Sequence, residues 1–215
     1  TAIIAVTSGI FLLITGLLIA KPILEALDTP EDVIDLAVLY LRIYSLGMPF
    51  MMIYNFGAAI LRSLGDTKRP FYSLVVAGAI NVGLNFLLVI EFEMSVAGVA
   101  VATVISNIVN AGIIVFFLTH EKGVFRLELK QLSISKAELK KILQIGVPAG
   151  IQGMVFSISN VFVLATINSF GSAAVAGSSA ALNYEYYCYF VVSAFAQATV
   201  AFTSQNYGAG QIERC

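Results

Sequence analysis

Charged residues are scarce in this chain. Only 12% of its 215 residues are Asp, Glu, Lys or Arg, while 59% are hydrophobic. Soluble domains carry about 25% charged residues, so the chain has roughly half the usual share. Together with long apolar runs, this deficit excludes an ordinary soluble domain and predicts an all-α integral membrane protein.

Residues that carry reaction chemistry are also few. The two cysteines, Cys188 and Cys215, form no disulfide framework, and the single histidine, His120, cannot form a metal cluster. There is no GxSxG motif, no Walker motif and no pair of aspartates within an apolar run. We therefore predict that the protein is not an enzyme and has no cofactor or metal site. Without a Walker motif, ion gradients rather than ATP are the expected energy source. Basic residues lie at the ends of apolar runs and not along one face, so nucleic acid is not an expected partner.

Six stretches are long and apolar enough to cross a bilayer. A membrane helix needs about 20 mostly apolar residues, and the predicted spans are approximately 2–20, 38–61, 70–90, 97–118, 142–167 and 174–203. The last stretch is long enough to tilt or to extend beyond the lipid. The sequence thus predicts a polytopic helix bundle whose partner is the lipid bilayer.

The connections between these stretches alternate in charge. Those at 21–37 and 91–96 are acidic, whereas those at 62–69 and 119–141 are rich in Lys and Arg. Because Lys and Arg remain on the cytoplasmic side, we predict cytoplasmic turns at the basic connections. The first stretch then runs from the inside of the membrane to the outside.

The longest polar connection indicates a domain boundary. We predict that 1–118 forms four membrane helices of one lobe, 119–136 a cytoplasmic linker, and 137–215 two membrane helices of a second lobe. The chain starts at Thr1 inside an apolar stretch and ends after a glycine-rich turn, so we interpret it as a fragment of a longer protein.

Two prolines lie within predicted spans. Pro49 and Pro148 each remove a helical hydrogen bond, which favours a kink, and neighbouring glycines lower the cost of bending. One interpretation is a pair of hinges for alternating access to the two sides of the membrane. The other is a pair of static kinks filled by packing.

One acidic residue lies well inside an apolar run. Glu185 would lie about 16 Å along a helix that begins near residue 174, close to the middle of the membrane. A carboxylate there is a candidate for binding a proton or a cation, and Tyr189 shares its helix face. The alternative is an interfacial belt of tyrosines with a glutamate that reaches the outer headgroups.

Uncharged polar residues recur in four of the predicted spans. Amides in membrane helices usually join helices to one another, yet as a group they also predict a polar interior that binds substrate or ion. Besides Glu185 and Tyr189, the candidate binding residues are Tyr54, Asn81, Asn85, Gln152 and Asn160.

Several motifs resemble those of a known family, the multidrug and toxic compound extrusion (MATE) transporters. The first lobe carries ILRSLGDTKRP, then INVGLNFLLVI and VAGVAVATVISN. The second carries IGVPAGIQGMVFSISNVFV, INSFGSAAVAG and SQNYGAG. The basic turn followed by the Asn-rich helix is fairly specific, the last motif is typical of the family, and the resemblance covers essentially the whole chain.

The resemblance implies a twelve-helix transporter with two lobes, of which this chain holds about the third to eighth helices. Such proteins export cationic amphipathic drugs in exchange for H+ or Na+, and a monomer in a bacterial inner membrane is expected. Asn81 matches a family asparagine, but Asn85 stands where DinF-like members often have Asp. Phe156 stands where NorM-like members have Glu, which leaves Glu185 as a substitute acid.

Other functions are compatible with a polytopic bundle. A lipid-linked oligosaccharide flippase of the same superfamily should have several basic residues inside its helices to hold pyrophosphate, and only Arg42 comes close. A membrane scaffold without transport activity, or an embedded enzyme, is a third possibility. The hinge prolines and polar interior weigh against a scaffold, and the lack of catalytic motifs weighs against an enzyme.

Overall fold

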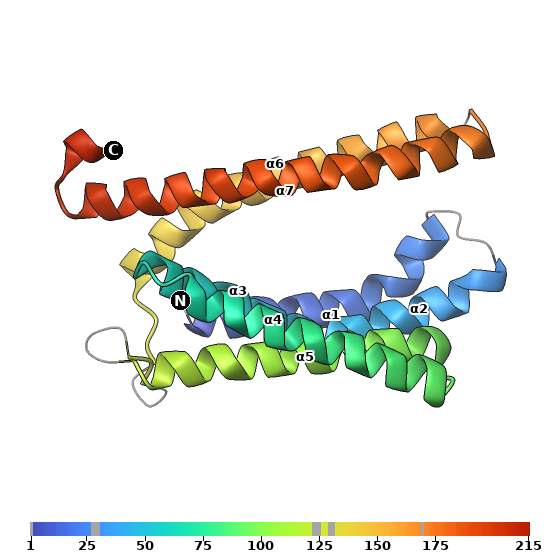
Figure 1. The fold of residues 1–215 in the computed structure, drawn as a ribbon, viewed down its shortest axis with the longest axis horizontal. Coiled ribbons are helices and arrows are strands. Elements are labelled where there is room, and N and C mark those ends of the chain that lie inside the picture. The colour runs from blue at the N-terminus through green and yellow to red at the C-terminus, as the bar shows by residue number, and fades with distance from the viewer. Residues whose placement is uncertain (1, 27–30, 122–125, 129–131, 169) are drawn as a thin grey trace. The chain divides into compact units, whose positions relative to one another are not determined.

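The computed structural model describes residues 2–26, 31–121, 126–128, 132–168 and 170–215, and every regular element within these ranges is a helix (Figure 1). This confirms the predicted all-α fold class. The chain divides into two compact units, Thr1–Ser133 and Ile134–Cys215. The division falls inside the segment predicted as a linker, 119–136, of which 122–125 and 129–131 lie outside the described residues.

The first unit is a bundle in which one helix contacts most of the others. Its described elements are α1 (Ala2–Ala26), α2 (Glu31–Leu46), α3 (Met48–Ser63), α4 (Lys68–Asn85), the π-helix η1 (Phe86–Glu91) and α5 (Ser95–Thr119). α5 packs against α2, α3 and α4, while α1 packs against α2 and α3. Buried small residues on α5, among them Gly98 and Ala102, allow the neighbouring helices to approach closely.

The apolar core of this unit lies where α3 and α5 meet. Leu61 and Ile114 have no exposed surface, and Leu118 is 4% exposed. Leu127, in the chain after α5, packs against the same cluster, and its backbone N–H donates to the carbonyl of Leu118 at 2.9 Å. The start of the predicted linker is therefore held against the first unit.

The second unit is a pair of long helices. Its described elements are α6 (Lys136–Asn168), α7 (Ser172–Gly208) and the short 3-10 helix η3 (Ile212–Arg214), and α6 and α7 run side by side (Figure 1). Gly171, which ends the connection between them, has a φ of 91°, a conformation that residues with a side chain rarely adopt. Large apolar side chains line the outside of the pair, as expected for helices surrounded by lipid or by further membrane helices.

The predicted number of spans agrees with the structure. Five helices in the described ranges are long and apolar enough to cross a membrane, and α2 and α3 together supply a sixth when their bent pair counts as one span. The helices extend beyond the predicted apolar stretches, because polar residues at their ends continue the same helical turns. α7, for example, runs from Ser172 to Gly208 instead of from 174 to 203.

The α2–α3 pair is bent by 45° beside Pro49. Pro49 lies in the first turn of α3, directly after the break at Gly47. Because proline has no N–H, it cannot continue the α-helical bonding from the preceding turn. The predicted kink is therefore present at Pro49, whereas its use as a hinge remains a prediction.

The sequence predicts one continuous helix over 70–90, but the span after the α3–α4 turn is not α-helical throughout. α4 ends at Asn85, and η1 continues it as a π-helix from Phe86 to Glu91. At its end the N–H of Phe92 bonds to the carbonyl of Leu87 at 3.1 Å, one residue further back than in an α-helix. Such wide turns often occur next to functional residues, and this one follows Asn85 directly.

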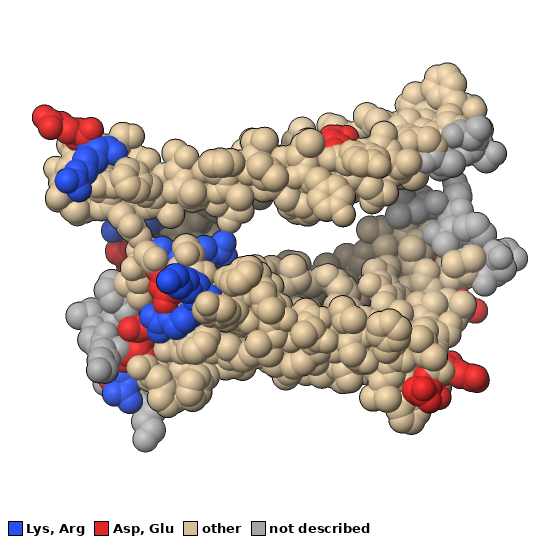
Figure 2. Space-filling view, in the orientation of Figure 1, with Lys and Arg blue, Asp and Glu red and all other residues tan. Residues whose placement is uncertain are grey.

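The two ends of the first unit differ in the charged residues that they carry. On the face that Figure 2 shows, basic side chains gather at one end of the unit with acidic ones among them, whereas the charged side chains visible at the opposite end are acidic. Lys and Arg favour the cytoplasmic side of a membrane. This distribution agrees with the predicted cytoplasmic position of the turn between α3 and α4, which remains a prediction.

An arginine joins this turn to α5. Arg69 forms an ion pair with Asp66 in the turn and a second one with Glu121 just beyond α5, where Nη1 and Oε2 are 2.5 Å apart. Its guanidinium carbon also lies 5.9 Å from the centre of the Phe117 ring. Burial alone would raise the pKa of Asp66, but hydrogen bonds from the side chain and backbone of Arg69 outweigh burial, so the pKa lies below its ordinary value.

We expect Arg69→Gln to destabilise the protein at neutral pH. The substitution leaves Asp66 and Glu121 without their shared cation, and the loss should be on the order of 1 kcal/mol because solvent screens a partly exposed group. Since folding lowers the pKa of Asp66, its stabilisation is present above about pH 3.9 and disappears as the pH falls through the lower folded value. Thermal unfolding of the intact protein in detergent at pH 7 and pH 3 measures both effects.

Lys68→Gln is the matched control for this experiment. Lys68 precedes Arg69 in the same turn of helix, and its side chain forms no ion pair with any described residue. Equal losses of stability for the two variants at pH 7 would contradict the assigned role of Arg69.

Candidate functional site

Glu185, the acidic residue predicted to lie inside the membrane, lines a cavity between α6 and α7. The cavity measures about 270 Å³ and is lined by Phe156, Asn160, Val163, Ile167, Leu182, Glu185, Tyr186 and Tyr189. Asn160 comes from α6, and Glu185 and Tyr189 come from α7. Three of the predicted site residues, from two different helices, therefore line one cavity.

The chemistry of this cavity suits a cation. Glu185 forms no ion pair with any described residue. The rings of Tyr186 and Tyr189 line the cavity beside it, and each also contacts the ring of Phe190. A carboxylate can neutralise a cation, and the faces of aromatic rings attract one. The amide of Asn160 adds a polar group from the opposite helix.

The helical repeat explains how these side chains meet. Leu182, Glu185, Tyr186 and Tyr189 are spaced three or four residues apart and so share one face of α7. The lining residues of α6 follow the same rule. Gln152 lies one turn before Phe156 on α6, outside the set of residues that line the cavity.

Polar residues also join α4 to α5 within the first unit. The hydroxyl of Ser73 donates to the carbonyl of Asn110 at 3.2 Å and also bonds to its amide oxygen. Two turns further along α4, Nδ2 of Asn81 donates to Oγ of Ser106 at 3.3 Å. These bonds join the helices, which is the ordinary use of amides in membrane bundles.

Asn85 carries a polar atom without a partner. Its Nδ2 donates to the backbone oxygen and to Oδ1 of Asn81, at 2.9 Å and 3.1 Å. Its own Oδ1 is buried and accepts no hydrogen bond from any described residue. A buried acceptor left unpaired costs about 1–3 kcal/mol, so this oxygen is available to a bound cation or donor.

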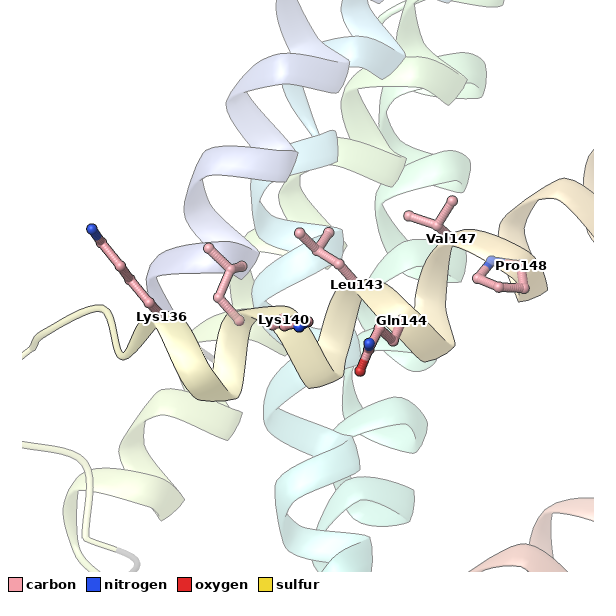
Figure 3. A pocket seen from close by; sticks show the side chains of 7 residues that line it. Lys136, Lys140, Leu143, Gln144, Val147 and Pro148 are labelled. Atoms are coloured by element: carbon pink, nitrogen blue, oxygen red, sulfur yellow. The ribbon is translucent and has the colours of Figure 1, made fainter.

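The remaining predicted site residues lie apart from these two groups. Tyr54 packs against the apolar cluster of Leu61, Ile114 and Leu118. Pro148 lies inside α6 at the end of a groove formed by Lys136, Leu139, Lys140, Leu143, Gln144 and Val147 (Figure 3). In that view Lys136, Leu143 and Val147 project from the same side of the helix.

Comparison with known families decides what kind of protein this is. The model of the MatE family matches residues 1–87 and 148–215, well over half of the chain. The chain belongs to the MatE family. This confirms the resemblance inferred from the motifs, and the long apolar helices in both units agree with a multi-pass membrane protein.

Two bacterial relatives and one solved structure show the extent of the likeness. The chain is 31% identical over 213 residues to "Probable multidrug resistance protein YoeA" of Bacillus subtilis (strain 168), covering 96% of this chain and 46% of that protein. It is 32% identical over 203 residues to "Probable multidrug resistance protein YpnP" of the same organism, covering 93% and 44%. "Crystal structure of MATE in the bent conformation" matches 99% of this chain and 48% of that chain with a TM-score of 0.88 and 25% identity. The chain thus spans about half the length of the curated relatives it matches.

Two residues of this MatE chain that form hydrogen bonds between α4 and α5 were not predicted from the sequence. Neither Ser73 nor Ser106 is among the site residues predicted from the sequence. A repeat of small and polar residues at every fourth position could have indicated them. On α4 the repeat consists of Ser73, Ala77, Asn81 and Asn85, and on α5 of Gly98, Ala102, Ser106 and Asn110. Two such stripes form complementary faces when the helices pack.

Proposed function

We propose that the intact protein exports cationic amphipathic compounds across a bacterial inner membrane in exchange for H+ or Na+. The observation that carries this proposal is the cavity between α6 and α7, where Glu185 lies beside Tyr186 and Tyr189 and has no ion-pair partner among the described residues. Family membership and the names of the two Bacillus relatives support the same activity.

Exchange follows from competition for one carboxylate. With a proton or Na+ bound, Glu185 is neutralised and a drug cation has no partner in the cavity. When the ion leaves, the exposed negative charge attracts the cationic head of the drug, and the tyrosine rings contact its aromatic part. Because both ligands need the same group, binding of one displaces the other, which couples their movement.

The position of the acid differs from that in NorM-like members. By resemblance, those proteins carry a glutamate at the position of Phe156 on α6. Phe156 and Glu185 line the same cavity, so we propose that α7 supplies the carboxylate that α6 lacks. Gln152, one turn away on α6, is available to a longer substrate.

Alternating access requires parts of the protein to move against each other. We propose that the bend at Pro49 and the proline inside α6, Pro148, are the hinges, as sites of missing backbone hydrogen bonds. No cofactor is needed in this scheme, and a monomer is sufficient because one chain supplies both lobes.

The asparagines of α4 are a second candidate ion site. We expect Asn81→Leu to lower the free energy of unfolding by roughly 0.6 to 1.7 kcal/mol, because it removes the bond to Ser106. Asn85→Leu should lower stability less than Asn81→Leu does, because the loss of its two hydrogen bonds to Asn81 is offset by removal of a buried oxygen that has no donor among the described residues. If Asn85 also binds the transported ion, its variant is stable but exports less.

Thermal unfolding and export, measured on the same preparations, separate these effects. Asn110, whose backbone and side chain both accept from Ser73, offers a comparison at the other end of the α4–α5 contact. A loss of stability for Asn85→Leu as large as that for Asn81→Leu would contradict the assignment of an unpaired oxygen.

The test of the overall function uses the intact protein in proteoliposomes. A pH gradient and then a Na+ gradient are imposed, and movement of ethidium across the membrane is followed by fluorescence. Ethidium movement driven by either gradient supports the proposal and names the ion. Its absence under both gradients favours the oligosaccharide flippase or a scaffold. Of the described residues inside spans, Arg42 on α2 comes closest to the buried basic charge that a flippase needs.

A further inference from the structure

A second cavity, unrelated to the polar residues above, lies in the first unit. It measures about 300 Å³, which is at the small end of the range for ligand pockets. Its walls come from α1, α3 and α5 and from the chain that follows α5, and they consist of Ala2, Ile3, Ala5, Val6, Thr7, Ile53, Phe56, Gly57, Ile60, Val115, Leu118, Leu127 and Leu132.

The lining of this cavity is suited to hydrocarbon. Thr7 is the one side chain in it with a polar atom, and its hydroxyl bonds to the carbonyls of Ile3 and Ile4 at 2.9 Å and 3.2 Å within its own helix. No polar group in the lining therefore needs a partner from a ligand. A space of this size between close-packed helices forfeits dispersion contacts unless an apolar group fills it.

The cavity lies at the predicted cytoplasmic end of the unit. Ile60 and Leu118, which line it, come from the last turns of α3 and α5, beside the basic α3–α4 turn. In a bacterial inner membrane this end lies in the cytoplasmic leaflet, where anionic lipids attract Lys and Arg near the surface. A lipid of that leaflet can place an acyl chain at this depth.

A basic side chain is held close to two residues of the lining, Leu118 and Leu127. Arg126 lies next to Leu127 in sequence, and its Nε donates to the carbonyl of Thr119 at 3.2 Å, one residue beyond Leu118. It forms no ion pair within the described ranges. Its other guanidinium N–H groups remain for a phosphate, which arginine binds well. Glu121 is engaged by Arg69, and Glu128 is exposed and unpaired with Arg126.

We propose that this cavity binds one acyl chain of an anionic phospholipid of the cytoplasmic leaflet, with Arg126 contacting its phosphate and Leu127 and Leu132 contacting the acyl chain. Three described residues that follow α5, Arg126, Leu127 and Leu132, are then part of a lipid site. This proposal is independent of the export function, because none of its residues lines the cavity around Glu185.

Native mass spectrometry of the intact protein, purified in mild detergent and titrated with phosphatidylglycerol or phosphatidylcholine, tests the site. Wild type should retain phosphatidylglycerol in preference to phosphatidylcholine. Arg126→Gln should weaken phosphatidylglycerol binding about fivefold, the effect of one basic residue near an anionic surface, and leave phosphatidylcholine unchanged. Val115→Phe, which fills the cavity from α5, should abolish retention of both lipids.

Two charge controls and a second filling variant keep the result unambiguous. Lys68→Gln removes a cation at the same end without touching the cavity, and Glu128→Gln removes a neighbouring negative charge, so neither should weaken phosphatidylglycerol binding. Ile3→Phe fills the cavity from α1 and replaces Val115→Phe if that variant does not fold. Unchanged lipid retention in a folded filling variant, or equal losses from Arg126→Gln and Lys68→Gln, would overturn the proposal. So would a structure of the intact protein in which another part of the polypeptide fills the cavity.

Discussion

Glu185→Gln is expected to remove ion-driven export while leaving the protein folded. The variant keeps the size and hydrogen-bonding capacity of the side chain but loses the charge that attracts a cation. In a medium of low dielectric constant this attraction is worth more than 1.4 kcal/mol, so gradient-driven export should fall at least about tenfold. The measurement is uptake or release of a fluorescent cation in proteoliposomes under a pH gradient and under a Na+ gradient.

Two further variants define what a loss of export means. Glu185→Asp keeps the charge on a shorter side chain and should retain part of the activity. Glu213→Gln removes an exposed acid in η3, outside the cavity, and should export as wild type does. Binding of the cation, measured directly, should weaken in Glu185→Gln and not in Glu213→Gln.

The opposite outcome has a definite structural meaning. If Glu185→Gln couples export to both gradients as well as wild type, the carboxylate only reaches the outer headgroups among a belt of tyrosines. Coupling would then depend on other residues, and the asparagines of α4 become the candidates within this chain. The cavity between α6 and α7 would in that case still be available to the uncharged part of a drug.

The sequence predicted this cavity only in part. Helical spacing placed Glu185 and Tyr189 on one face of α7, because residues four apart always share a face. It could not place Asn160 opposite them, since the sequence of one helix does not state which face of its neighbour it meets. The same limit explains Tyr54, whose polar hydroxyl suggested a polar interior although its ring packs against an apolar cluster.

Some features of the fold could likewise be predicted from the sequence, and others could not. Span number and the bend at Pro49 were predictable, because apolar length and a missing N–H act locally. The π-helix after Asn85 was not, since Phe86 to Glu91 is uniformly apolar apart from its last residue and so gives no period that separates one helix type from another. In the structure η1 packs against α5, with Leu88 close to Gly98, and the sequence of one helix does not state such contacts with another.

Gly9→Ala is expected to cause a large loss of stability for so small a change. Gly9 is buried on α1, and a Cβ there would lie 2.5 Å from Cα and 3.2 Å from the backbone N of Pro49. Backbone atoms cannot rotate away, so α1 must shift from the α2–α3 bend. Overpacking of this kind costs about 1–3 kcal/mol, which thermal unfolding of the intact protein in detergent will detect as a lower Tm.

The control is a glycine in the same unit with open space around it. A Cβ at Gly78 on α4 meets nothing within 4 Å, so Gly78→Ala should be neutral, or stabilising by up to about 1 kcal/mol, because alanine favours the helix. Gly16→Ala lies between these cases, since its Cβ would meet the movable hydroxyl of Ser45. An unchanged Tm for Gly9→Ala would contradict the close contact of α1 with Pro49. A lower Tm supports close packing of α1 against the α2–α3 bend, and we then expect any hinge motion at Pro49 to involve α1.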